Sequence, residues 1–105
     1  MGFEAFLADY ETSDLRDNAQ YWLAETHYVR KNFKAALKGF LEVITDYPAS
    51  RKLADAWLKI GYCNYELGNE DEAHRALNTA ITRFPESTAA RLAKERITLM
   101  DTNNN

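Results

Sequence analysis

The fold is decided by residues 47–85, which read YPASRKLADAWLKIGYCNYELGNEDEAHRALNTAITRFP. Pro48 and Pro85 bound this stretch, and proline cannot continue a helix. Between them, apolar and small residues recur at helical spacing on both sides of Leu67-Gly68-Asn69. Glycine readily takes the left-handed conformation that ends a helix. The stretch therefore predicts two helices, one beginning near Ser50 and the other running from Glu70 to Phe84.

The same plan occurs 37 residues earlier in the chain. A shift by that length superposes residues of one kind: Tyr28 on Tyr65, Asn32 on Asn69, Ala36 on Ala73, Pro48 on Pro85, Leu23 on Ile60, Ala24 on Gly61, Phe40 on Leu77, Tyr47 on Phe84, and Ser13 on Ser50 and Ser87. Chance does not align small, aromatic and proline residues at one offset. The chain is therefore an internal repeat of antiparallel helix pairs.

Two local features support these pairs. A serine at each repeat start, Ser13, Ser50 or Ser87, is predicted to cap the first helix by accepting a free backbone N–H. Small residues are predicted to let paired helices approach closely, namely Ala24, Ala36, Gly61 and Ala73.

We expect one all-α domain of about six helices over residues 1–101. Its parts are predicted as a second helix of a truncated repeat at 3–10, repeats at 14–48 and 50–85, a capping helix at 87–100, and a disordered tail at 102–105. The truncated repeat carries Phe3, Phe6 and Leu7 on one helical face. Stacked repeats bury such a face only against a neighbour, so self-association through this N-terminal helix is expected.

Composition argues against several function classes. The net charge is −3 and no Lys or Arg cluster forms a phosphate-binding footprint, so nucleic acid is not an expected partner. No apolar run approaches the ~20 residues of a membrane span. Cys63 is the one cysteine, and His27 and His74 lack the pairing of a helical zinc site. No catalytic motif or cofactor loop occurs, so we expect neither an enzyme nor a cofactor.

A stripe on the first helices is the candidate binding surface. Spacing of i, i+4 and i+7 places these residues on the concave side of the array: Tyr21, Glu25, Tyr28, Leu58, Tyr62, Tyr65, Leu92, Glu95 and Leu99. Such an aromatic, weakly acidic groove suits an extended or helical peptide, because tyrosine offers apolar area with a polar tip. The alternative is that these rings pack between neighbouring first helices and only support the array.

The pattern resembles the tetratricopeptide repeat, through Trp57, Ile60-Gly61, Gly68, Ala73, Leu77, Ala80 and Pro85. The resemblance implies a right-handed superhelix of antiparallel helix pairs that binds proteins. The 37-residue unit is longer than the usual 34 residues, and its extra residues form Tyr-Pro-x-Ser at Tyr47–Ser50. This longer turn resembles repeats of bacterial cell-envelope proteins.

Three segments are similar to one envelope family in particular, the C-terminal domain of the periplasmic Tol–Pal cell-division coordinator family (CpoB/YbgF). They are residues 18–25, 58–68 and 89–93. The resemblance implies a periplasmic adaptor that contacts TolA and couples outer-membrane constriction to a peptidoglycan synthase during division. Members also carry a signal peptide in the precursor and a coiled coil elsewhere in the full-length protein.

Two other assignments stay open. The Tyr-Pro-x-Ser turn is shared with a repeat lipoprotein of outer-membrane protein assembly. A generic tetratricopeptide-repeat scaffold with no envelope role is the third hypothesis.

Overall fold

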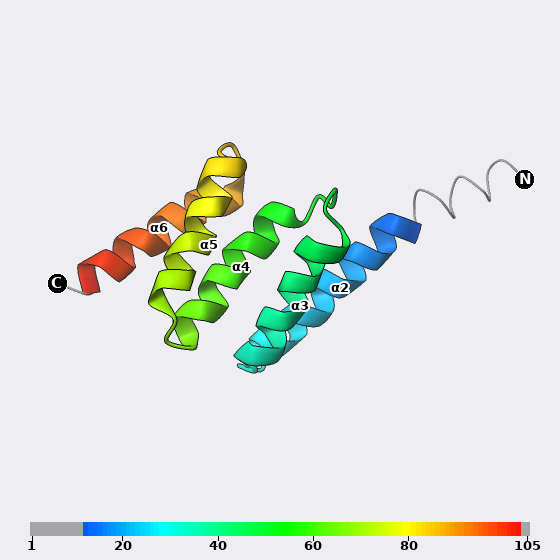
Figure 1. The fold of residues 1–105 in the computed structure, drawn as a ribbon, viewed down its shortest axis with the longest axis horizontal. Helices are drawn as coiled ribbons and strands as arrows, with labels where there is room; N and C mark the ends of the chain where they lie inside the picture. Colours follow the sequence, from blue (N-terminus) through cyan, green and yellow to red (C-terminus); the bar gives the residue numbers. More distant parts are fainter. Residues whose placement is uncertain (1–11, 104–105) are drawn as a thin grey trace, which may run out of the picture.

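The computed structural model describes residues 12–103 and confirms the all-α prediction (Figure 1). Its five helices are α2 (Thr12–Val29), α3 (Phe33–Asp46), α4 (Leu53–Glu66), α5 (Glu70–Arg83) and α6 (Thr88–Asn103). They stack side by side in chain order, so that each helix packs on the next, and α4 also packs on α6. The helix predicted at 3–10 lies outside the described residues, as do Phe3, Phe6 and Leu7.

The core of the described residues consists of two clusters, one between the two helix pairs and one among α4, α5 and α6. The first is centred on Phe40 and Val43 of α3, which pack with Ala24 and with residues of α4. The second is centred on Leu77 of α5 and Met100 of α6. Trp57 is half-buried and packs against both clusters, so it joins the two pairs.

Small residues hold each pair together, with one change from the prediction. A Cβ placed on Gly61 would lie 2.5 Å from Leu77 Cδ2, so glycine is required for the close approach of α4 to α5. In the first pair, a Cβ on Gly39 would lie 2.7 Å from Ala24 Cβ. The close contact of α2 with α3 therefore depends on Gly39, which the sequence did not single out.

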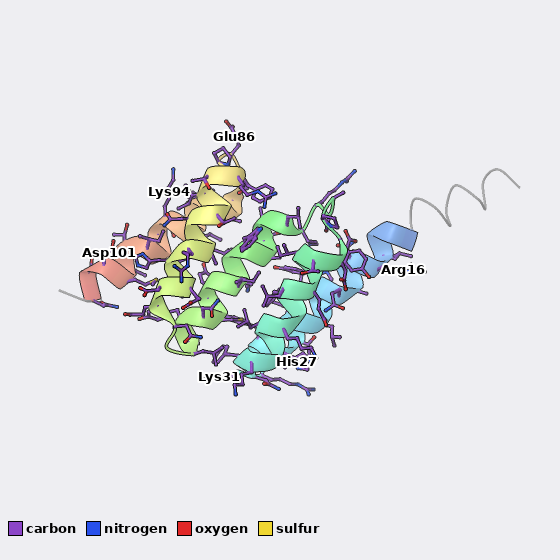
Figure 2. All side chains as sticks on the ribbon, viewed as in Figure 1. Arg16, His27, Lys31, Glu86, Lys94 and Asp101 are labelled. Carbon is purple, nitrogen blue, oxygen red and sulfur yellow. The ribbon has the colours of Figure 1, made fainter. Side chains whose placement is uncertain are left out.

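The two turns within the pairs share one backbone geometry. Gly68 has φ +86°, as predicted for the residue that ends α4. Lys31, labelled in Figure 2, stands 37 residues earlier and has φ +65°. A side chain at this left-handed position costs about 1–2 kcal/mol. The turn between α4 and α5 therefore adopts the positive φ with a glycine, whereas the turn between α2 and α3 adopts it with Lys31 and is strained.

The side chain of Ser13 lies outside the described side chains, and the two other predicted serine caps differ from each other. The Ser87 hydroxyl accepts from the Ala90 N–H at 3.0 Å and caps α6, as predicted. The Ser50 hydroxyl instead accepts from the Lys52 N–H at 2.9 Å. That bond closes a turn ahead of α4, so α4 begins at Leu53 and the prediction of a Ser50 cap was wrong.

The C-terminal helix runs further than expected. Residues 102 and 103, predicted to belong to a disordered tail, form the end of α6. No Gly or Pro follows Met100, and this side chain is fully buried. Asp101 also lies 3.4 Å from His74 of α5, so the last turn is held against its neighbour.

Candidate protein-binding face

Successive first helices meet through aromatic rings and cations. The ring centroids of Tyr28 on α2 and Tyr62 on α4 lie 6.4 Å apart. Lys59 Nζ lies 4.5 Å from the centroid of Tyr28 and 5.8 Å from that of Tyr62. A cation at this range is attracted to the ring face. We call the surface formed by Glu25, Tyr28, Lys59, Tyr62, Tyr65 and Arg96 the first-helix face.

The charge of Lys59 is balanced by an ion pair with Glu25. Its Nζ lies 3.1 Å from Glu25 Oε1 and donates to Glu25 Oε2 at 3.2 Å. The two side chains are only 18% and 22% exposed, so water screens the pair less than an ordinary surface pair. This ion pair joins α4 to α2 across the first-helix face.

Arg96 repeats the contact one unit later. Its guanidinium carbon lies 4.0 Å from the centroid of Tyr62 and 5.8 Å from that of Tyr65. Lys59 and Arg96 are 37 residues apart, and each follows a tyrosine, Tyr28 or Tyr65, by 31 residues. Neither cation was among the predicted groove residues, although this regular offset could have identified both. The face is therefore not merely aromatic and weakly acidic.

Two of the predicted groove residues are not available on the surface. Tyr21 is 6% exposed and packs edge-on against Phe40, with ring centroids 5.3 Å apart. Leu58 is 4% exposed in the second core cluster. Their placement in an accessible groove was wrong, because α3 covers the first ring and the second helix pair surrounds the leucine.

The remaining predicted residues are partly or fully accessible. Glu25, Tyr28, Tyr62 and Tyr65 are half-buried on the first-helix face. On α6, Leu92 is half-buried and packs on the second core cluster, whereas Glu95 and Leu99 are exposed. Glu95 turns to Arg91, at 3.1 Å. The tyrosines thus both pack between first helices and remain open on one side.

Burial affects the tyrosines of this face. It raises the pKa of the Tyr28 and Tyr62 phenols above the ordinary value, and the nearby Arg96 charge partly opposes that rise. For Tyr21, which is more deeply buried, the pKa is raised further. All three rings therefore stay neutral near pH 7 and act as apolar surfaces with a hydroxyl at the tip.

Shallow hollows lie at both ends of the first-helix face. One, of about 280 Å³, is lined by Trp22, Glu25, Thr26, Val29 and Arg30. The other, of about 240 Å³, is lined by Tyr65, Glu66, Arg96, Leu99, Met100 and Asn103. Side chains of a partner can fit into these two hollows.

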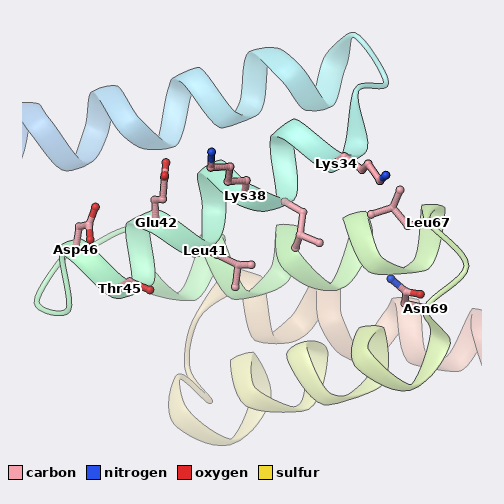
Figure 3. A pocket seen from close by; sticks show the side chains of 9 residues that line it. Lys34, Lys38, Leu41, Glu42, Thr45, Asp46, Leu67 and Asn69 are labelled. Carbon is pink, nitrogen blue, oxygen red and sulfur yellow. The ribbon is translucent and has the colours of Figure 1, made fainter.

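A larger hollow lies on the α3 side of the array. It measures about 530 Å³ and lies between α3 and the turn that joins α4 to α5 (Figure 3). Leu37, Leu41 and Leu67 supply its apolar lining, and Lys34, Lys38, Glu42 and Asp46 stand around them. It holds no aromatic ring, and its charges are balanced.

Other reactive groups are placed outside any site. Cys63 is fully buried, and burial raises the pKa of its thiol to about 12. Within residues 12–103, His, Cys, Asp and Glu form no group of three that could hold a metal ion. None of the helices that the structure describes has the length and apolarity to cross a membrane.

Comparison with models of known protein families gives a match. The family model for the tetratricopeptide repeat matches residues 18–50 and 55–87, which together make up more than half of the chain. Each matched segment covers one of the two helix pairs. A comparison with curated proteins found no match.

Proposed function

The chain belongs to the tetratricopeptide-repeat family of protein-interaction scaffolds, and from this premise we propose that its partner binds across the first-helix face. The observation that carries the proposal is the run of half-buried tyrosines and cations that crosses three helices, from Tyr28 through Tyr62 to Arg96. Tyrosine and arginine are enriched where binding energy concentrates in interfaces.

The face is suited to a segment rather than to a flat globular surface. Its side chains project from successive parallel helices, and a hollow lies at each end. An extended or helical peptide can lay apolar side chains against the rings of Tyr28 and Tyr62. It can also place polar groups against the phenol hydroxyls and the charged ends of Lys59 and Arg96.

We further propose that the partner belongs to the bacterial cell envelope. The longer repeat with its Tyr-Pro-x-Ser turn supports this assignment, as does the resemblance of residues 18–25, 58–68 and 89–93 to the Tol–Pal cell-division coordinators. On this proposal the chain is a periplasmic adaptor that binds TolA. It would thereby help to coordinate peptidoglycan synthesis with outer-membrane constriction.

The test is a binding measurement with purified TolA. Tyr62→Ala combined with Tyr65→Ala removes two half-buried rings and should weaken binding about tenfold or more. Leu41→Ala, in the hollow beside α3, is the matched control and should leave binding unchanged. Far-UV circular dichroism checks that both variants keep their helices.

The outcomes separate the face from the partner. Undiminished TolA binding by the tyrosine variant would refute the first-helix face. Loss of binding in the Leu41→Ala variant alone would assign the partner to the α3 side. If the native chain does not bind TolA, the Tol–Pal assignment fails, and the generic scaffold or the assembly lipoprotein replaces it.

A further inference from the structure

Arg96 and Lys59 occupy the same position in consecutive units but have different neighbours. Lys59 is neutralised by Glu25. The residue 37 positions after Glu25 is Tyr62, so the second unit has a ring where the first has a carboxylate. Arg96 stacks on that ring instead. The repeat therefore reproduces the cation and omits its counter-ion.

No other carboxylate replaces the missing one. Among the ion pairs of residues 15–103, none includes Arg96. The adjacent Glu95 is engaged with Arg91 at 3.1 Å. Glu66 lines the same hollow as Arg96 but is exposed and makes no ion pair with it. The guanidinium thus keeps its charge without a partner in the described part of the chain.

The contact with the Tyr62 ring does not occupy the N–H donors of Arg96. A guanidinium carries five N–H donors in its own plane, and a ring that covers one face of the plane does not use them. The Arg96 side chain donates no hydrogen bond to the other described residues. The planar fork matches a carboxylate, which can accept two of these N–H groups at once.

The surroundings add an apolar component. The hollow of about 240 Å³ beside Arg96 is also lined by Met100 and by Leu99, which is 57% exposed. An exposed leucine beside a free cation fits a partner segment in which an acidic residue has an apolar neighbour. Charge complementarity favours this segment over a neutral one.

We propose that the Arg96 hollow binds an Asp or Glu side chain of the partner segment, with an adjacent apolar residue against Leu99. This inference rests on the proposed function, because it names the chemistry of the partner at one end of the first-helix face. It assigns Arg96 as the residue that selects acidic segments, whereas the tyrosines supply contact area.

The test uses two peptides that differ in one group. Both have blocked termini and a polyalanine background; one contains Leu-Glu-Leu and the other Leu-Gln-Leu. Titration of the isotope-labelled protein, followed at the backbone N–H resonances of Glu66, Leu99 and Met100 around the hollow, gives both dissociation constants in the native protein and in the variants. We expect the Glu peptide to bind roughly 3–10-fold more tightly than the Gln peptide, with the preference decreasing at high salt.

Variants assign that preference to the guanidinium. Arg96→Gln should abolish the difference between the peptides, and Arg96→Lys should retain part of it, because Lys keeps the charge but not the fork. Lys94→Gln, which removes an exposed cation of α6 that makes no ion pair among the described residues, is the control and should retain all of it. Glu66→Gln should strengthen binding of the Glu peptide, because it removes a like charge from the hollow.

Three results would overturn the inference: equal binding of both peptides, a Glu preference that persists in Arg96→Gln, or no Glu-dependent shift up to about 10 mM peptide. A third peptide, Leu-Leu with a free C-terminal carboxylate, tests the other source of this group, and tighter binding of that peptide also overturns it. If the peptides show no Arg96-dependent preference but the tyrosine variant still loses TolA binding, the inference fails and the proposed function stands. If the peptides show the preference but the tyrosine variant binds TolA undiminished, the proposal that TolA binds across the first-helix face is refuted.

Discussion

The close contact between α2 and α3 can be tested by exchanging the residues that form it. Gly39 and Ala24 are both buried, and a methyl group on Gly39 would lie 2.7 Å from Ala24 Cβ and 3.3 Å from its Cα. The obstruction includes backbone, so a side-chain rotation cannot relieve it. Gly39→Ala must therefore move one helix away from the other.

The expected magnitudes follow from opposing effects. Alanine in place of a helical glycine gains about 0.5–1 kcal/mol, whereas overpacking costs about 1–3 kcal/mol. We therefore expect Gly39→Ala to lower the free energy of unfolding by about 1–2 kcal/mol. Ala24→Gly should lower it by about 2 kcal/mol, because it loses a buried methyl group and adds a glycine to α2.

The double variant should recover most of the loss. Ala24→Gly with Gly39→Ala keeps the number of methyl groups and helical glycines constant, so its stability should lie within about 1 kcal/mol of the native value. The equivalent positions of the second helix pair, 37 residues later, already hold glycine and alanine in this order, Gly61 and Ala76, although a Cβ on Gly61 would meet Leu77.

Urea denaturation followed by far-UV circular dichroism measures all of these free energies. Ala19→Gly on the exposed side of α2 is the control for helix propensity and should cost about 1 kcal/mol without coupling to Gly39. The reasoning is refuted if Gly39→Ala stabilises the protein. It is also refuted if the double variant loses the full sum of the two single losses.

Three further predictions concern the turns, the cysteine and the caps. Lys31→Gly should raise the free energy of unfolding by about 1 kcal/mol, and Gly68→Ala should lower it by about as much, because both residues have a positive φ. A methyl group on Gly68 would meet no atom within 4 Å, so the change in the urea midpoint measures backbone strain alone. Cys63 should resist iodoacetamide in the native protein at about pH 8 and react only in denaturant, because burial raises its pKa to about 12 and favours the neutral thiol. The contribution of this pKa shift to stability is complete below the ordinary thiol pKa and is lost as the pH rises from there towards about 12; rapid labelling of the native protein would contradict the burial of the thiol. Ser87→Ala should lower the free energy of unfolding by about 1 kcal/mol and Ser50→Ala should lower it less, because only the Ser87 hydroxyl caps a helix. Equal decreases in the melting temperature would argue against this distinction.

Local patterns were sufficient for the elements of this fold. Proline and glycine punctuation together with helical periodicity predicted α3, α4 and α5 to within a few residues, and the left-handed turn at Gly68 was correct. The equivalent turn at Lys31 was not anticipated. Lysine shows no preference for a positive φ, and only the packing of α3 against α2 imposes it.

The sequence by itself determined the repeat, its helices and the candidate tyrosines, because periodicity and turn chemistry depend on residues close together in the chain. Only the tertiary structure decided which side chains of a stripe reach the surface. Packed helices cross at an angle, so one stripe meets different neighbours along its length. On α2, Tyr21 therefore lies beneath α3 against Phe40, while Tyr28 meets Tyr62 of α4. The tertiary structure also decided that Arg96 has no counter-ion among the described residues. Its guanidinium on α6 faces Tyr62 of α4, whereas the equivalent Lys59 on α4 faces Glu25 of α2.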